Sequence, residues 1–182
     1  MLLFYLFMMH HPLEGRRESA IRCLDLPAMN QLYGQNPLFI FDPRDDRNRP
    51  DPRYHQNALA FWPLYPSWFR GLFEKSFTEG MTDPLHGRVR ESEWRAATLA
   101  LRDSLVYCAS CGAENAVEHP DHPLVCWHCR RPVPLPLRLE LGRKTVYLNS
   151  DTHLYPWHVR LDPEVDFSRP VGAVGQNPQN PR

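Results

Sequence analysis

Apolar residues open this chain and then recur with a helical period through much of its first hundred residues. The run MLLFYLFMM covers residues 1–9 and ends at His10-His11-Pro12. No capping residue precedes the run, so we interpret residues 1–9 as the buried part of a core helix whose beginning is missing. A membrane-spanning helix needs about 20 apolar residues, which is more than this run has. An export signal has basic residues before its apolar stretch, and none precedes this run. We therefore expect a cytoplasmic protein without membrane association.

A strong helix is predicted over residues 67–80. Phe69, Phe73 and Phe77 recur every four residues, so their rings share one face of a helix. Ser67 is a suitable N-terminal cap and Gly80 a suitable end. Because an aromatic stripe at this spacing is typical of a core face, we expect the rings to be buried.

A second strong helix is predicted from residue 91 into the first cysteine pair. Its apolar face carries Trp94, Ala97, Leu101 and Leu105. Weaker signals come earlier in the chain. Residues 21–29 have near-helical spacing that Pro27 interrupts, and Gly34 is a plausible stop. Residues 37–41 form a short apolar stretch, and residues 42–57 predict a solvated, charged loop.

The periodicity changes from helical to alternating after residue 132. Leucines occupy every second position from Leu135 to Leu141, and Val146 and Leu148 continue the pattern after the turn residues 142–144. This alternation predicts a β-hairpin. The tail, VGAVGQNPQNPR, contains turn residues and predicts no regular element.

Composition narrows the classes of function. The 182 residues carry 21 Lys and Arg against 21 Asp and Glu, so the formal net charge is zero. Nucleic-acid-binding proteins usually carry a basic excess, so the charge balance argues against nucleic acid as a partner. The 19 prolines and 9 glycines are too few to predict a disordered chain.

Four of the five cysteines form two Cys-x-x-Cys pairs, Cys108 with Cys111 and Cys126 with Cys129. Each pair can direct two thiolates at one ion, and the intervening loop is long enough to bring the pairs together. This pattern predicts a structural zinc ion, because four thiolates leave no open coordination position for catalysis.

Other interpretations of the cysteines remain open at this stage. Two disulfides would require an oxidising compartment, and a redox motif normally has a single pair. A nearby histidine could replace one cysteine; the candidates are His119, His122 and His128. We expect Cys23, which stands alone, to be a small buried apolar side chain.

Three stretches resemble the late C-lobe of a serine/threonine protein kinase. They are LLFYLFMMHHPLEG (2–15), LYPSWFRGLFEKSFTEGMTDP (64–84) and GRVRESEW (87–94), which has Arg88, Glu93 and Trp94 in matching places. Together with the cysteine pairs and the HLYPWHV segment (153–159), the chain resembles a bacterial serine/threonine-kinase-like family. The sequence contains no G-x-G-x-x-G loop, H-R-D loop or D-F-G motif, so the resemblance implies no phosphotransfer activity and no residue is assigned as catalytic.

The combined prediction is an α+β protein with three segments. Residues 1–107 would form a partial kinase-like C-lobe, residues 108–131 a four-cysteine zinc ribbon, and residues 132–182 a β-hairpin module with an irregular tail. The predicted function is that of a truncated, non-catalytic, zinc-binding pseudoenzyme that scaffolds or binds a protein partner, for which the missing kinase N-terminal part is one candidate. The alternatives are an autonomous zinc-ribbon interaction module and, less favoured by charge, a nucleic-acid-binding zinc protein.

Overall fold

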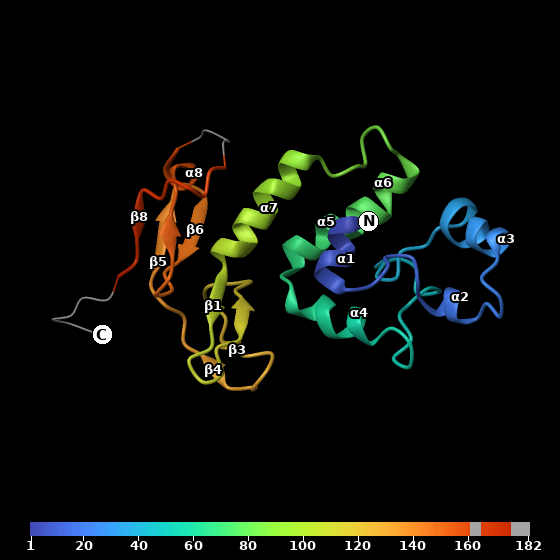
Figure 1. The fold of residues 1–182 in the computed structure, drawn as a ribbon, viewed down its shortest axis with the longest axis horizontal. Coiled ribbons are helices and arrows are strands. Elements are labelled where there is room, and N and C mark those ends of the chain that lie inside the picture. The colour runs from blue at the N-terminus through green and yellow to red at the C-terminus, as the bar shows by residue number, and fades with distance from the viewer. Residues whose placement is uncertain (161–164, 176–182) are drawn as a thin grey trace. The chain divides into compact units, whose positions relative to one another are not determined.

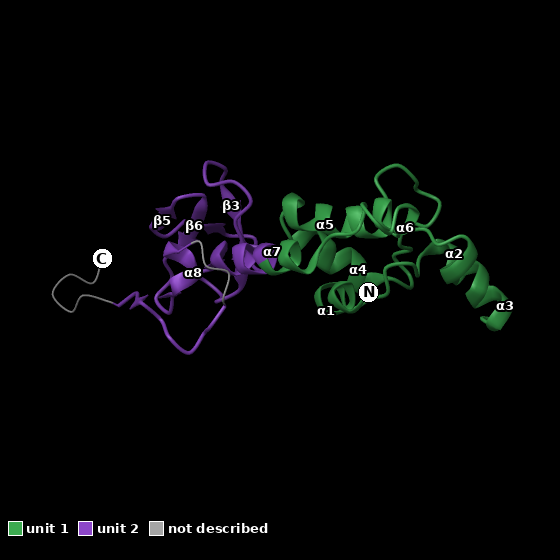
Figure 2. Cartoon of the chain, turned by 90° about the horizontal axis from the view of Figure 1, so that it is seen from above, with its two compact units in different colours: residues 1–95 green, residues 96–182 purple. Residues whose placement is uncertain are grey.

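The computed structural model describes residues 1–160 and 165–175 (Figure 1). The chain divides into two compact units, residues 1–95 and residues 96–182, which Figure 2 colours green and purple. Unit 1 is helical, whereas unit 2 contains small antiparallel sheets, so the predicted α+β class is confirmed. The finer division into a partial C-lobe, a ribbon and a hairpin module stays a prediction.

Unit 1 is built from short helices around one aromatic core. Its α-helices are α1 (Leu2–Met8), α2 (Arg16–Ser19), α3 (Leu26–Met29), α4 (Gln56–Phe61), α5 (Ser67–Phe77), α6 (Glu79–Thr82) and the start of α7 (Glu91–Asp103). A π-helical turn (Asn30–Gln35) follows α3, and a 3₁₀ turn (Trp62–Leu64) follows α4.

Phe4 of α1 lies at the centre of the unit 1 core. Its ring meets Phe39, Phe73 and Phe77 edge-on, with centroids 5.3–5.8 Å apart. Edge-to-face pairs at this spacing add about 0.5–1.5 kcal/mol each beyond the burial of their surface. The predicted aromatic face of residues 67–80 is confirmed for Phe69 and Phe73, which are fully buried.

Two predictions of burial are wrong. In α1 only Phe4 and Met8 are buried, and the apolar side chains exposed along residues 1–9 are Met1, Leu2, Tyr5, Leu6 and Met9. Cys23 is exposed as well, because it lies on the surface segment between α2 and α3. Apolar character alone does not show whether the folded chain covers a side chain.

Three predicted boundaries shift in the structure. Ser67 is the first helical residue of α5 and Pro66 takes the capping position, while Gly80 lies inside α6 rather than ending α5. The helix from residue 91 ends at Asp103, so Leu105 belongs to a strand. Pro66 has an extended backbone (φ −57°, ψ 151°), which is the type of conformation that the residue before a helix adopts.

The charged loop over residues 42–57 is only partly solvated, because Asn48 is completely buried. Its side-chain NH₂ donates to the carbonyl oxygens of Leu13 and Leu38, and its Oδ1 accepts from the backbone N–H of Arg17. Asn48 therefore joins three separate segments of unit 1. Gly15 is needed beside it, since a Cβ at that position would lie 2.1 Å from the Asn48 carbonyl oxygen.

Two histidines of unit 1 act as hydrogen-bond acceptors for the backbone. Nδ1 of buried His55 accepts from the N–H of Asp51 at 2.7 Å, and Nδ1 of His11 accepts from the N–H of Leu13. An imidazole can accept at Nδ1 only while that nitrogen is unprotonated. Burial lowers the pKa of both histidines, and the neighbouring His10 lowers each pKa further, while Glu14 near His11 and Glu18 near His55 act in the opposite direction.

We predict that the free energy of unfolding of unit 1 falls as the pH is lowered from 7.5 to 5.5. A histidine whose pKa is lower in the folded than in the unfolded chain stabilises the fold above its unfolded pKa of about 6.5, and this contribution is lost as the pH falls through the folded pKa. Denaturant unfolding, monitored through the NMR resonances of unit 1, measures the effect. His55→Gln should reduce the pH dependence, and an unchanged slope in that variant would contradict the assignment.

The described residues of unit 2 form four two-stranded antiparallel sheets. The pairs are β1 (Leu105–Tyr107) with β2 (Glu114–Ala116), β3 (Leu124–Val125) with β4 (Pro132–Val133), β5 (Arg138–Leu141) with β6 (Lys144–Tyr147), and β7 (His153–Leu154) with β8 (Gly172–Ala173). The β5–β6 pair confirms the predicted hairpin, with Leu139 opposite Val146 and Gly142 in the left-handed region of the turn.

The end of α7 is fixed to α8 (Pro156–Val159) by a buried pair of titratable groups. His158 Nε2 lies 3.2 Å from an Asp103 carboxylate oxygen, and His158 Nδ1 accepts from the N–H of Tyr155. Burial raises the pKa of Asp103 above its usual value, and the neighbouring His158 offsets part of this increase.

Within the described residues, the structure contains no helix with the length and apolar character that a bilayer crossing requires.

Candidate metal centre

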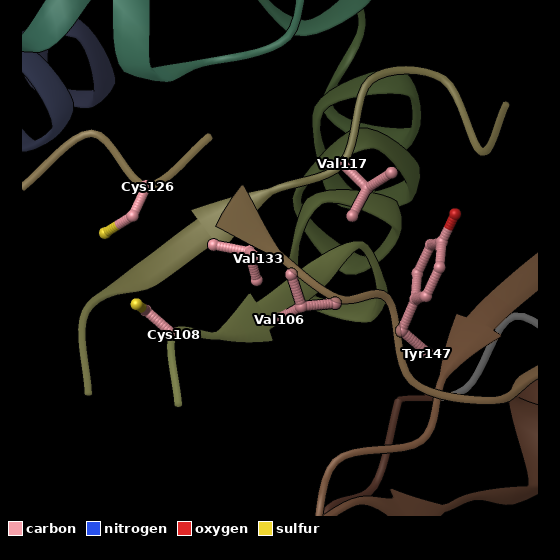
Figure 3. Close-up of a cluster of buried hydrophobic side chains, with 6 residues drawn as sticks. All are labelled: Val106, Cys108, Val117, Cys126, Val133 and Tyr147. Carbon is pink, nitrogen blue, oxygen red and sulfur yellow. The ribbon is translucent and has the colours of Figure 1, made fainter. Parts of the chain in front are cut away.

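The two Cys-x-x-Cys pairs lie in the turns of two consecutive hairpins. Cys108 directly follows β1 and Cys111 lies in the turn to β2, while Cys126 follows β3 and Cys129 lies in the turn to β4. Cys108 and Cys126 also belong to the buried apolar cluster of unit 2, with Val106, Val117, Val133 and Tyr147 (Figure 3). The hairpins therefore carry their cysteines at one end of a shared core.

The four sulfur atoms converge on one point. All lie within 4.8 Å of one another, and the Cys108–Cys129 and Cys111–Cys126 separations are both 3.6 Å. A tetrahedral ion with metal–sulfur bonds of about 2.3 Å requires sulfur separations of about 3.8 Å, so the set fits such an ion. A disulfide needs an S–S distance of about 2.05 Å, and all five cysteines are free thiols.

The two turns have the same backbone geometry. The first cysteine of each pair donates its N–H to the carbonyl oxygen five residues on, Cys108 to Ala113 and Cys126 to Arg131, both at 2.9 Å. Its carbonyl oxygen accepts from the N–H four residues on, and that residue has a left-handed backbone. Glycine meets this requirement at Gly112 (φ 73°), whereas the second turn places Arg130 (φ 61°) there.

We predict that Arg130→Gly stabilises the second turn. A residue with a Cβ loses about 1–2 kcal/mol in the left-handed region, although the greater freedom of glycine in the unfolded chain offsets part of the gain. A net stabilisation of about 0.5–1 kcal/mol is expected from denaturant unfolding with the metal bound. Gly112→Ala is the matched control and should destabilise the protein. A destabilised Arg130→Gly variant would show that the Arg130 side chain makes a compensating contribution.

Without a bound metal, the thiols of Cys126 and Cys111 have widely separated pKa values. Burial alone would raise the pKa of Cys126, but N–H groups of Cys129 and His128 donate to its sulfur and lower the pKa to about 6. The N–H of Ala113 favours the Cys111 thiolate, but desolvation and the neighbouring sulfurs together raise its pKa to about 12. Four adjacent thiolates repel one another, so a bound cation is needed to hold all four in the ionised form.

Asn115 links the two turns beneath the sulfur cluster, a role that no sequence pattern predicts. Its side chain is buried, with Nδ2 donating to the Ala113 carbonyl oxygen at 2.7 Å and lying 3.8 Å from the Cys126 sulfur. Its Oδ1 accepts from the backbone N–H of Trp127. Because both turns share this one amide, Asn115 sets their separation and donates to a ligand sulfur.

We predict that Asn115→Ala weakens metal binding by about 10- to 100-fold, the usual effect of removing a group that orients metal ligands. Competition between the protein and a chromophoric chelator for added Zn²⁺ or Co²⁺ measures the affinity. Glu114→Gln is the matched control, because only the backbone carbonyl of Glu114 takes part, as acceptor for the Trp127 indole N–H. Equal affinities in both variants would remove the proposed role of Asn115.

The histidines considered as alternative ligands are not part of the cluster. The side chains of His119, His122 and His128 are exposed, and only cysteines make up the metal-binding group found among the described residues. Cys23 is also outside it. The predicted convergence of four cysteines is confirmed, and the identity of the ion stays a prediction.

Comparisons of the chain with protein-family models, with curated proteins and with solved structures gave no match.

Proposed function

We propose that this chain is a non-catalytic, partner-binding protein whose unit 2 folds around one structural Zn²⁺. The observation that supports this most directly is the convergence of four thiolates within 4.8 Å. Zinc forms tetrahedral sites with four cysteine ligands, and such closed sites stabilise folds rather than activate water. Cys108, Cys111, Cys126 and Cys129 would hold the ion, and its chemistry there would be to link the two hairpin turns.

A protein partner is supported by the apolar side chains that α1 and the capping residue after it, Met9, present to solvent. Tyr5, Leu6 and Met9 are 57%, 64% and 59% exposed. A surface helix of a globular protein usually has a polar outer face, so an apolar outer face indicates a surface that another protein covers. In a serine/threonine-kinase-like protein, which the sequence resembles, the remainder of the kinase fold would be such a partner.

The zinc ribbon itself offers a second candidate surface, which favours an autonomous interaction module. Val125 and Trp127, two positions apart in the second hairpin, are 53% and 41% exposed. The indole N–H of Trp127 donates to the Glu114 carbonyl oxygen, so the ring is held in place. Fixed aromatic side chains are common at the centres of protein interfaces.

Metal analysis and an activity assay on the purified full chain test the proposal together. We expect one equivalent of Zn²⁺ per chain and no phosphate transfer from ATP. Chelation of the metal should unfold unit 2, because the free energy of metal binding contributes to the free energy of folding. Cys126→Ser should lower the zinc content, whereas the matched Cys23→Ser should retain the full equivalent. Zinc-independent folding of unit 2 would contradict the structural role, and ATP-dependent phosphorylation would contradict the non-catalytic one.

A hydrophobic-dye titration then distinguishes the two candidate surfaces. If the outer face of α1 is the partner surface, Leu6→Ser should reduce dye binding and concentration-dependent self-association more than Val125→Ser. The reverse order would favour the ribbon as the interaction surface.

A further inference from the structure

Unit 1 contains a groove of about 630 Å³ that the proposed function does not use. Residues of α1, α5, α6 and the start of α7 line it, and most of the lining side chains are apolar, among them Phe4, Phe73, Phe77, Met81, Val89 and Trp94. Small-molecule sites typically have volumes of about 300–1,000 Å³ and a mostly apolar lining. Tyr5, Leu6 and Met9 of the proposed partner surface do not line the groove.

The polar side chains in the apolar part of the groove already have partners. The Ser76 hydroxyl donates to the Leu72 carbonyl oxygen at 2.7 Å, and the Tyr33 hydroxyl donates to the Glu14 carboxylate at 2.8 Å. An extended peptide would bring backbone N–H and C=O groups that need partners of their own. The apolar part is therefore better matched by a hydrocarbon chain, which makes no such demand.

The groove meets a cationic depression at Arg88, which lines both. Lys75, Arg90, His86 and Glu93 also line this depression of about 330 Å³. Within the described residues, the side chains of Lys75, Arg88 and Arg90 make no ion pair or hydrogen bond. The Glu93 carboxylate accepts from the backbone N–H of Arg90, and His86 is paired with Asp83. Three cationic side chains and one carboxylate thus line the depression, so its charge favours an anion.

The backbone that carries Arg88 is held in place by the glycine before it. Gly87 is buried, its N–H donates to the Asp83 carbonyl oxygen at 2.8 Å, and an added Cβ would lie 2.4 Å from the Glu79 carbonyl oxygen. This close packing fixes the turn against α6. The cation is therefore presented from a rigid segment, which lowers the ordering cost of binding.

We propose that unit 1 binds a long-chain amphiphile with an anionic headgroup, of the fatty-acid or lysophospholipid class. The hydrocarbon chain lies along Phe4, Phe73, Phe77 and Trp94, and the carboxylate or phosphate binds Arg88, with Lys75 and Arg90 beside it. Burial of the methylene groups supplies most of the affinity, and the headgroup sets the orientation and the selectivity for anions.

Isothermal titration of the zinc-loaded full chain tests this, with monomeric myristate compared with tetradecanol and with inorganic phosphate. We expect myristate to bind at least 10-fold more tightly than the alcohol, and phosphate alone not to bind measurably. Lysophosphatidate is the second anionic arm, and whichever anion binds more tightly identifies the preferred headgroup.

Arg88→Gln should weaken myristate binding about 10-fold and leave tetradecanol binding unchanged. Arg16→Gln removes the same charge from an exposed site in α2, outside the groove, and should change neither. Equal binding of myristate and the alcohol, equal effects of the two variants, or no myristate binding would overturn the proposal. So would light scattering that shows the groove closed by a second copy of the chain that myristate does not displace.

Discussion

Four cysteine sulfur atoms converge in unit 2, and we propose that the fold of this unit depends on an ion held there. The strands of its first two hairpins are only two or three residues long, and an isolated two-stranded hairpin is marginally stable at best. The buried cluster that these hairpins share is also small, and two of its six members are the cysteines Cys108 and Cys126. A bound ion would link residues that are up to 21 positions apart in the sequence, and it would replace the hydrophobic stabilisation that so small a core cannot supply.

Unit 1 is stabilised in a different way, by aromatic packing and buried hydrogen bonds. The rings around Phe4 form its core, while Asn48 joins residues 13, 17 and 38 through three hydrogen bonds. Yet α1 contributes two fully buried side chains to that core, while Tyr5 and Leu6 of α1 and Met9, which follows the helix, are exposed to solvent. The same short helix thus supports the fold and provides the surface to which we assign a protein partner.

The metal centre also shows how little of a site's support is visible in its ligands. Gly112 and Arg130 occupy equivalent left-handed positions, but only the first has the residue that this backbone favours. Asn115 reaches both turns because β2 pairs with β1 and places its side chain in the core below the sulfurs. The role of Asn115 does not follow from the spacing of residues alone, since it depends on how the two hairpins lie against each other.

Local patterns in the sequence determined which elements form and which cysteines meet. The phenylalanine spacing predicted α5, the alternating leucines predicted the β5–β6 hairpin, and the paired Cys-x-x-Cys turns predicted the thiolate cluster, because helical period, strand period and turn geometry act over a few residues. Tertiary structure alone decided what is covered. It buried Asn48 and His55 in a charged loop and exposed Cys23 and half of an apolar helix, because burial depends on which distant segments pack against a residue. For the same reason the apolar groove and its cationic end, brought together from helices and connecting segments that lie far apart in the sequence, exist only in the folded chain.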